Sequence, residues 1–347
     1  MSTFERVADL PLRLESYELE RLEHPISPEF TRVTTQVRLR GGGEEGIGED
    51  VTYDAAEHDR LAEQRHELEG EWTIATFSEH LVGLEFFPEP PEMEAYRDYR
   101  RWAFESAALD LALRQAGRSL ADVLGREPRP VSFVVSPRLG EPSSLEPIRR
   151  LLANYPGTRF KLDPIADWGP ELVEELARLR SVDVVDLKGQ YSGTVVDNPA
   201  DPVLYRLVAE GFPEAWIEDP ALTDETDPVL RPHRDRITWD APIHSVADIE
   251  GLPFPPRTLN IKPSRFGSIE RLFATYDYCD ERGMGMYGGG QFELGVGRGH
   301  IQYLASLFHP DSSNDVAPGG YNLAPSEPGL LSSPLEPAAD AVGFRWG

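Results

Sequence analysis

The sequence contains very little cysteine and very little lysine. Cys279 is the only cysteine among 347 residues, so an intrachain disulfide is impossible and a thiolate-rich metal site is excluded. Only three of the 34 basic residues are lysines, at Lys161, Lys188 and Lys262, and all the others are arginines. Arginine stays protonated near neutral pH, whereas lysine can exchange a proton when its surroundings lower its pKa. The three lysines are therefore the basic residues to consider for proton transfer.

Long apolar runs are also absent. No stretch approaches the roughly 20 apolar residues that cross a bilayer, and residues 1–25 contain no run of signal-peptide length. The net charge of −26 opposes binding to a phosphate backbone, which requires clustered lysine and arginine. We therefore expect a cytoplasmic protein that binds neither membranes nor nucleic acid.

The N-terminal third predicts a mixed α+β unit. Residues 15–22 and 33–40 alternate apolar and polar side chains, and a glycine-rich turn follows them, as in a β-meander. From Tyr99 the apolar residues recur at helical spacing. Gly117 is suited to the end of this helix, and Ser119 is suited to the start of a short helix after it.

From Val131 onward, short β-rich runs alternate with helical stretches. A β-then-α repeat implies parallel strands with right-handed crossovers, in a doubly wound sheet or a closed barrel. The seven runs are 131–136, 158–163, 182–188, 214–219, 236–240, 257–262 and 283–288. Their number favours the barrel, with an eighth strand sought near residues 315–317. The chain, at 40% hydrophobic content, is long enough for such a barrel and a smaller second domain.

Ionisable residues stand where these strands end, and the catalytic groups of a parallel barrel come from that edge. They are Lys161, Asp163, Asp186, Lys188, Glu218, Asp219, Asp240 and Lys262. Converging carboxylates repel one another unless a cation lies among them, and hard oxygen ligands suit Mg²⁺, or alternatively Mn²⁺. A salt bridge or a helix cap is the ordinary role of any single residue of this kind. Because such residues end several successive strands, the whole set instead indicates a metal site.

Several of these segments resemble the enolase superfamily. The succession KLD, VVDLKG, WIEDP, TWDAP, NIKPSRFGS and GGGQFELGVGRGH is most similar to the subgroup of muconate-lactonising enzymes and o-succinylbenzoate synthases, in a divergent form. Residues 33–50, which end in GIGED, resemble the strand and Gly-x-Gly-Glu hairpin of that superfamily's lid domain. The resemblance covers nearly the whole chain, and its closest segments are EDP and IKPSRFG.

The resemblance implies an α/β fold in which a modified TIM barrel, the enolase-like (β/α) barrel, carries an α+β capping domain. We assign residues 1–126 to the capping domain, or lid, and residues 127–325 to the catalytic barrel. Residues 326–347 are expected to return to the lid. Lid loops around residues 20–30 and 50–57 are expected to select the substrate.

The resemblance also implies roles for the residues at the strand ends. Asp186, Glu218 and Asp240 match the Mg²⁺ ligands, and Lys262 matches a general acid/base, with Lys161 close to it. The implied activity is abstraction of the proton α to the carboxylate of a small carboxylic acid, which gives an enediolate. Elimination of a β-leaving group, as in a dehydratase or o-succinylbenzoate synthase, or reprotonation, as in a racemase, epimerase or cycloisomerase, would follow.

Two strands depart from the subgroup's pattern. The second strand usually carries Lys-x-Lys, but here Asp163 takes the place of the second lysine; the third usually carries Asp-x-Asn, but here Lys188 takes the place of the asparagine. Residues i and i+2 of a strand point to the same side, so Lys188 should face the same cavity as Asp186. One hypothesis is that the second base has moved to Lys188, oriented by Asp163. The other is that the two form a compensating salt bridge in a one-base or inactive enzyme.

Later segments depart as well. Ala241 stands where family members often have a glutamate, which puts support for Lys262 in doubt. Residues 283–288 contain no histidine, so the His/Asp dyad of other superfamily members is missing. Glu293 matches a late glutamate of the subgroup, as a substrate-binding or supporting residue, or else as a hydrogen-bonding residue of the barrel rim. His300 is expected to have a packing or surface role on the helix that follows.

Two rival functions remain open at this stage. The first is a metal-independent barrel lyase in which Lys262 attacks a carbonyl and forms a Schiff base. The second is an inactive enolase-like barrel that binds an acid ligand or a protein partner. The sequence does not name the substrate, and a homo-oligomer is possible.

Overall fold

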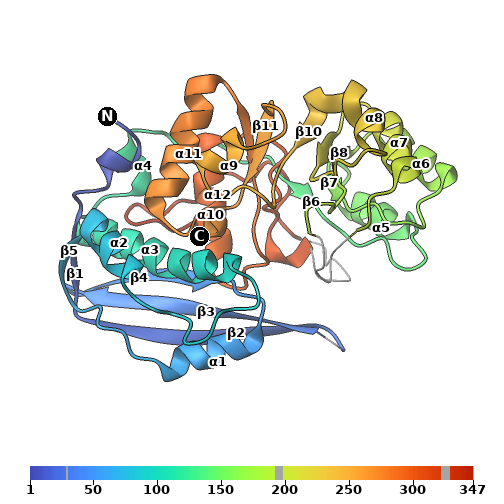
Figure 1. Ribbon diagram of the computed structural model, residues 1–347. Coiled ribbons are helices and arrows are strands. Elements are labelled where there is room, and N and C mark those ends of the chain that lie inside the picture. Colours follow the sequence, from blue (N-terminus) through green and yellow to red (C-terminus); the bar gives the residue numbers. More distant parts are fainter. Residues whose placement is uncertain (29, 192–197, 322–328, 347) are drawn as a thin grey trace.

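The computed structural model describes residues 1–28, 30–191, 198–321 and 329–346. An N-terminal antiparallel sheet with its helices lies beside a larger region of parallel strands and helices (Figure 1). We call the first part the lid and the second the barrel. Among the described residues, no helix combines the length and the apolar composition that a bilayer span requires.

The barrel strands coincide with the seven predicted runs. They are β6 (Val134–Val135), β7 (Arg159–Leu162), β8 (Val182–Asp186), β9 (Trp216–Glu218), β10 (Ile237–Thr238), β11 (Thr258–Ile261) and β12 (Gly285–Gly288). Strands β6 to β10 form one parallel sheet, and β11 pairs with β12 in a second. The Val side chains of β8 and the Leu and Ile side chains of β11 are buried, as expected of strands covered on both faces.

Backbone contacts link the two sheets on both sides. The Asn260 amide donates to the Trp239 carbonyl at 3.0 Å, which joins the β10 edge to β11. On the other side, Asn314 forms a parallel bridge with Phe133, and the next residue, Asp315, forms one with Gly289. The predicted eighth strand near residues 315–317 is therefore reduced to two bridged residues, and these lie between β12 and β6.

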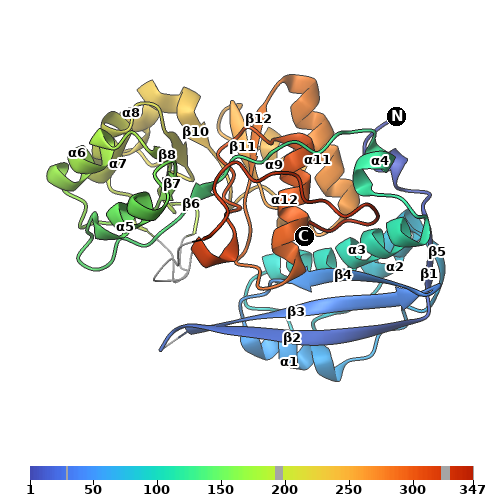
Figure 2. The same ribbon diagram turned by 180° about the vertical axis from the view of Figure 1, so that it is seen from behind.

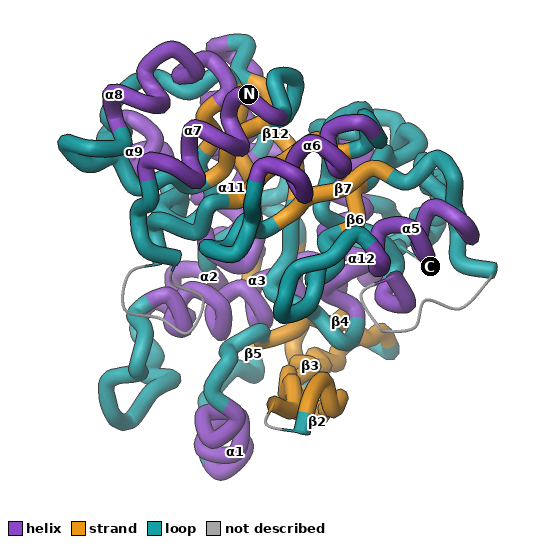
Figure 3. Tube along the Cα trace, turned by 90° about the vertical axis from the view of Figure 1, so that its right-hand side faces the viewer, coloured by secondary structure: helices purple, strands orange, loops and turns teal. Residues whose placement is uncertain are grey.

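Helices follow the barrel strands. They are α5 (Glu146–Asn154), α6 (Pro170–Arg178), α7 (Pro202–Gly211), α8 (Asp227–Leu230), α9 (Val246–Glu250), α10 (Pro263–Phe266), α11 (Ile269–Arg282) and α12 (Val296–Phe308), with 3-10 turns at η2 (Arg231–Arg236) and η3 (Gly319–Tyr321). Proline begins α6 and α7, where the missing N–H costs nothing. Figure 3 shows α5 and α6 beside the strands β6 and β7, with α7 next to α6.

The lid contains the predicted meander. Strands β2 (Ser16–Ser27), β3 (Phe30–Gly41) and β4 (Glu44–Asp50) pair in antiparallel order. Its remaining elements are η1 (Phe4–Arg6), β1 (Pro11–Leu14), α1 (Ala55–Glu63), β5 (Gly70–Thr73), α2 (Ile74–Val82), α3 (Ala95–Gln115) and α4 (Leu120–Leu124). The lid loop predicted around residues 20–30 is wrong, because residues 20–27 pair with β3 as strand; residue 29 lies outside the described residues.

The predicted helix boundaries at the end of the lid are confirmed. Helix α3 ends just before Gly117, which has a left-handed φ of +64°. The Ser119 side chain caps α4, and Gly125 ends that helix in the left-handed conformation. The start of α3 was predicted four residues too late; Tyr96, in the first turn of the helix, is already buried.

Two glycines let helix α3 lie directly on strand β4. A Cβ at Gly46 would come within 2.2 Å of the Ala107 carbonyl oxygen, and a Cβ at Gly48 within 1.9 Å of the Ala103 oxygen. Only glycine permits this approach. Helix α3 consequently lies between the lid sheet and the barrel helices, as Figures 1 and 2 show.

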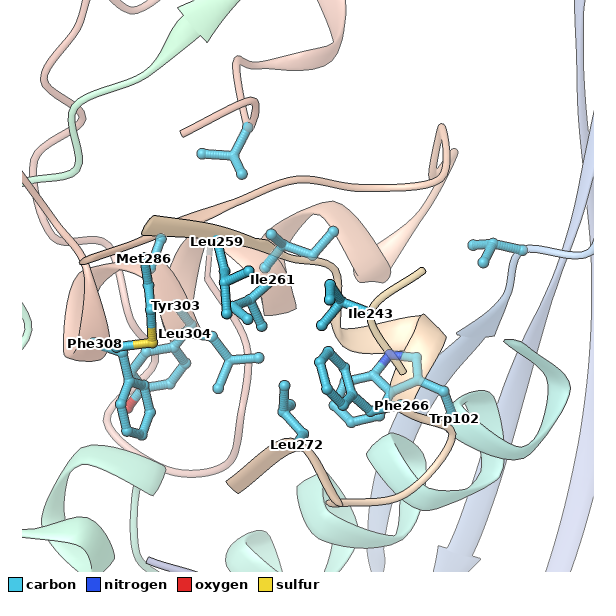
Figure 4. Packing of buried hydrophobic residues seen from close by; sticks show 14 of the residues in the cluster. Trp102, Ile243, Leu259, Ile261, Phe266, Leu272, Met286, Tyr303, Leu304 and Phe308 are labelled. Atoms are coloured by element: carbon cyan, nitrogen blue, oxygen red, sulfur yellow. The ribbon is translucent and has the colours of Figure 1, made fainter. Parts of the chain in front are cut away.

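One hydrophobic core extends from the lid into the barrel. Trp102 of α3 packs near Phe266 of α10, and Leu272, Leu259 and Ile261 continue the cluster into the barrel (Figure 4). The chain end also reaches the lid, because the Phe344 amide donates to Asp110 of α3 at 2.9 Å. The predicted boundary between residues 325 and 326 lies outside the described residues, and the three-part domain division stays a prediction.

Candidate active site

Three strand ends bring one lysine between two carboxylates. Lys161 at the end of β7 lies 3.0 Å from Asp186 of β8, and its ammonium also donates to Glu218 of β9. All three side chains are buried, so the lysine and the acids must compensate each other without water. Although burial opposes the charged form, Asp186 and Glu218 hold the pKa of Lys161 well above its ordinary value.

Glu218 is further held by two neutral side chains. The Tyr287 hydroxyl of β12 donates to its Oε2, and the Asn260 amide of β11 donates to its Oε1 at 3.3 Å. Burial nevertheless raises the pKa of Glu218 to about 8, against the opposing effect of Lys161. Sequence reasoning missed Tyr287 and Asn260. The available signal was a polar residue inside an otherwise buried strand.

Asp219 connects the ends of β9 and β10. Its two carboxylate oxygens accept the backbone amides of Asp240 and Ala241, each at 2.8 Å, and its own φ is +49°. Burial, together with the neighbouring Asp240 and Asp186, raises the pKa of Asp219 to about 7. Its neighbour in the EDP segment, Glu218, was predicted as a ligand, whereas Asp219 was given no role.

Asp240 is surrounded by cations. Lys262 lies 2.8 Å from its Oδ2, and Arg265 of α10 lies 3.1 Å from its Oδ1. The Tyr191 hydroxyl donates to Oδ2 at 2.9 Å and accepts from Arg265 at 2.8 Å. Although burial opposes ionisation, Arg265 and Lys262 hold the pKa of Asp240 well below its usual range. Arg265 and Tyr191 were not predicted, because both stand beyond the strand ends.

Lys188 and Asp163 lie at the more open side of the site. The Lys188 ammonium donates to Asp186, so the two side chains meet on the same side of the strand end, and it lies 3.8 Å from Asp163 Oδ1. Its φ of +54° is a left-handed conformation that few non-glycine residues adopt, and such backbone strain is found most often at functional sites. The Asp163 side chain is 46% exposed and Lys188 is 19% exposed, whereas Asp186 is fully buried. Solvent therefore reaches this pair more easily than the buried acids.

The buried carboxylates fit a hard divalent cation. Oxygens of Asp186, Glu218 and Asp219 lie within 4.8 Å of one another, and these are oxygen donors of the kind that Mg²⁺ prefers. Lys161 already presents a positive charge to two of them. Asp240, the third predicted ligand, is not in this group, and its assignment stays a prediction.

Glu293 and His300 lie beside the site rather than among its lysines. Glu293 follows β12, accepts the Gln291 amide at 2.6 Å and lies 3.4 Å from Arg298. His300 lies on α12, as predicted, and its ring stacks on that of Phe344 with centroids 4.2 Å apart. Burial gives His300 the predicted packing role.

Comparisons with known proteins agree with this architecture. Models of the C-terminal and N-terminal domains of a domain of unknown function (DUF8230) match residues 127–323 and 5–123. An N-succinylamino acid racemase of Thermus thermophilus is 27% identical over 85% of this chain and 83% of its own. An o-succinylbenzoate synthase of Bacillus subtilis is 28% identical over 67% of this chain and 64% of its own.

Solved structures show the same fold. A dipeptide epimerase from Methylococcus capsulatus, complexed with a Mg ion, has a TM-score of 0.70 at 20% identity, covering 96% of this chain and 99% of its own. A muconate cycloisomerase from Pseudomonas fluorescens has a TM-score of 0.68 at 18% identity, covering 96% of each chain. The predicted resemblance to the enolase superfamily, in divergent form, and the predicted fold class are therefore confirmed.

Proposed function

Because the chain belongs to the family described as a domain of unknown function (DUF8230) and has the enolase-superfamily fold, we propose that it is a Mg²⁺-dependent enzyme acting on a small carboxylic acid. It would abstract the proton α to the carboxylate. The reaction would then end in β-elimination, as in a lyase, or in reprotonation, as in a racemase, epimerase or cycloisomerase. Relatives named as a racemase and as a synthase support reprotonation and β-elimination, respectively.

The observation that carries the proposal is the arrangement of lysines around buried carboxylates. Lys161 bridges Asp186 and Glu218, and Lys262 and Lys188 each pair with an acid of the same set. Asp186 and Glu218 would hold the metal, with Asp240 as the third ligand that the resemblance implies. Bound Mg²⁺ would supply positive charge that stabilises the charge developing on the substrate carboxylate.

The lysines would divide the remaining work. Lys262, at the end of β11, would take the α-proton in its neutral form. Lys188, whose strand is separated from β11 by two others, would serve as the second proton-transfer group, with Asp163 orienting it. Lys161 has two carboxylate partners and would stay charged, which offsets the negative charge of the ligand set.

Proton exchange in D₂O tests the proposal. A panel of carboxylic acids that includes N-succinylamino acids would be incubated with the protein and Mg²⁺, and loss of the α-proton signal followed by NMR. We expect exchange that stops with EDTA and in Lys262→Ala. Calorimetry should show Mg²⁺ binding that Asp186→Asn removes. Exchange that survives EDTA, or a borohydride-trapped adduct on Lys262, would favour the Schiff-base enzyme instead.

Lys188→Arg is the matched variant for the second base. Arginine keeps the positive charge beside Asp186 and Asp163 but cannot exchange a proton near neutral pH. If Lys188 transfers protons, Lys188→Arg should lose racemisation or exchange at one face while Mg²⁺ binding persists. Full activity of Lys188→Arg would show that Lys188 only compensates the charge of the neighbouring acids, as in the one-base hypothesis.

A further inference from the structure

Two buried lid residues of opposite charge hold one loop of the barrel. This loop, residues 289–295, joins β12 to α12 and is called the glycine-rich loop below. Arg32 of β3 and Glu49 of β4 contact it, and their exposed fractions are 0% and 1%. Both charges have been removed from water, so each must be compensated by polar groups nearby.

Arg32 is compensated by carbonyl groups. Its guanidinium donates to the Gln291 oxygen at 2.9 Å and the Phe292 oxygen at 3.1 Å, both in the glycine-rich loop. It also donates to the oxygens of Val51 and Thr52, each at 2.7 Å. Within the described part of the chain, all four of these acceptors are backbone carbonyls. Phe292 has a left-handed φ of +61°, so Arg32 binds the strained point of the loop.

Glu49 is compensated by amide groups. Its carboxylate accepts the N–H groups of Leu294 at 2.7 Å, Gly295 at 3.0 Å and Gly297 at 2.8 Å. These amides begin helix α12, whose N-cap residue, Gly295, has no side chain to cap it. A residue of the lid therefore caps a helix of the barrel, where the helix dipole also favours a negative charge.

The glycine-rich loop in turn contacts the candidate active site through Gln291. With its amide oriented to suit its neighbours, the Gln291 oxygen accepts from Arg265 at 2.9 Å and from the Tyr99 hydroxyl at 3.1 Å. Arg265 lies 3.1 Å from Asp240, and Asp240 lies 2.8 Å from Lys262. A continuous set of contacts thus runs from the lid to the lysine.

We propose that Arg32 and Glu49 are positioning residues that clamp the glycine-rich loop and thereby place Gln291, Arg265 and Lys262. The assignment of Lys262 to the chemistry rests on the function proposed above, whereas the clamp itself does not. In this arrangement the lid fixes the position of Lys262 through the glycine-rich loop, and this effect requires no contact between the lid and the substrate. A direct measurement of the coupling between the lid and Lys262 tests this arrangement.

The scarcity of lysine provides that measurement. Because the chain has three lysines and all three lie at the site, ¹³Cε-lysine labelling gives three NMR signals from the full-length protein, assigned by single lysine-to-arginine variants. Hydrogen exchange with mass spectrometry reports the loop. In Glu49→Gln we expect about 10- to 100-fold faster exchange of amides 294–297, since charge-assisted hydrogen bonds are lost. We also expect a displaced Lys262 signal.

Glu105→Gln is the matched control. Glu105 is another buried lid glutamate that accepts a barrel helix amide, from Ile269 at 3.2 Å, but it contacts α11 instead of the glycine-rich loop. Its replacement should leave the loop amides and the Lys262 signal unchanged. Should Glu49→Gln fail to fold, Arg32→Lys keeps the charge and loses most of the carbonyl contacts, and it should give the same two effects.

Two results would overturn the proposal. If amides 294–297 keep their protection in the clamp variants, the clamp does not hold the loop. If they lose protection while the Lys262 signal stays in place, the contacts are purely structural. Neither measurement depends on turnover. A wild-type protein that exchanges no α-proton would therefore contradict the proposed function without contradicting the clamp.

Discussion

The Glu218 carboxylate is held by side chains from three other strands, namely Lys161 of β7, Asn260 of β11 and Tyr287 of β12. As a proposed metal ligand, Glu218 would offer its oxygens in one orientation, which lowers the entropy lost on binding. Tyr287 is the least obvious of the three because its hydroxyl emerges from a buried strand. Loss of its hydroxyl should therefore lower the metal affinity more directly than the rate of the chemical step.

Replacing Tyr287 with phenylalanine tests this contribution. Tyr287→Phe removes only the hydroxyl that donates to Glu218, and we expect Mg²⁺ affinity to fall by about 10- to 100-fold. Isothermal titration calorimetry gives the affinity directly. Tyr303→Phe is the control, because that buried hydroxyl accepts the Ala121 amide at 3.2 Å, in α4. Equal Mg²⁺ affinity in Tyr287→Phe and wild type would contradict the role.

The sequence predicted the charged residues of the site better than the neutral ones. Asp186, Glu218 and Lys161 interrupt apolar strands at matched spacing, and this pattern is visible without a structure. Tyr287 and Asn260 also lie within strands, but Tyr is common in buried strands and a single Asn has no spacing to match. The structure was needed to show that both point at Glu218.

At the scale of elements, strand β4 and helix α3 depend on the glycines that separate them. A Cβ at Gly48 would lie 1.9 Å from the Ala103 carbonyl oxygen, a backbone atom that cannot move without shifting α3. We expect Gly48→Ala to lower the free energy of unfolding by roughly 2–4 kcal/mol, measured by urea denaturation. Gly157→Ala is the control, since a Cβ there meets nothing within 4 Å, and its effect should stay within about 0.5 kcal/mol. Similar losses in both variants would exclude the packing explanation.

Helix α12 and the C-terminal segment meet at a buried histidine. Burial lowers the pKa of His300 to about 4, so the folded protein keeps this ring neutral while the unfolded chain titrates near 6.5. Between these values the unfolded state binds more protons, and the stability from His300 is present above about pH 6.5 and lost as the pH falls toward 4. We expect wild-type unfolding free energy to fall between pH 7.5 and 5.5 by about 1 kcal/mol more than that of His300→Gln. Parallel pH profiles for the two proteins would show that His300 does not titrate this way.

The regular strands of the barrel could be predicted from the sequence, whereas its irregular eighth position could not. The seven barrel strands have periodic apolar runs long enough to recognise, whereas the eighth position of the barrel consists of the bridges at Asn314 and Asp315. Residues 20–27 were predicted as a loop, although Leu22, His24 and Ile26 form the half-buried face of strand β2. Pairing with β3 makes this segment a strand, and pairing partners cannot be read from one segment alone.

At the scale of the whole molecule, the surface carries a large excess of acids, whereas at the site lysines compensate the buried acids. The chain has 60 acidic and 34 basic residues, and its three lysines are gathered at the site, where they compensate buried acids. The surface is therefore left with arginines and a large excess of carboxylates. Exposed pairs such as Arg40 with Glu18 offset little of that excess, since surface ion pairs contribute about 0–1 kcal/mol each.

The excess charge makes stability depend on salt. A net charge of −26 destabilises the compact state through self-repulsion, and salt shortens the range of that repulsion from about 14 Å at 0.05 M to about 3 Å at 1 M. We expect the Tm to rise by on the order of 5 °C over this range, in EDTA so that metal binding does not contribute. NaCl and KCl should act alike if screening is the cause. A Tm that stays constant or falls as salt is added would show that specific ion pairs, not net repulsion, dominate the surface electrostatics.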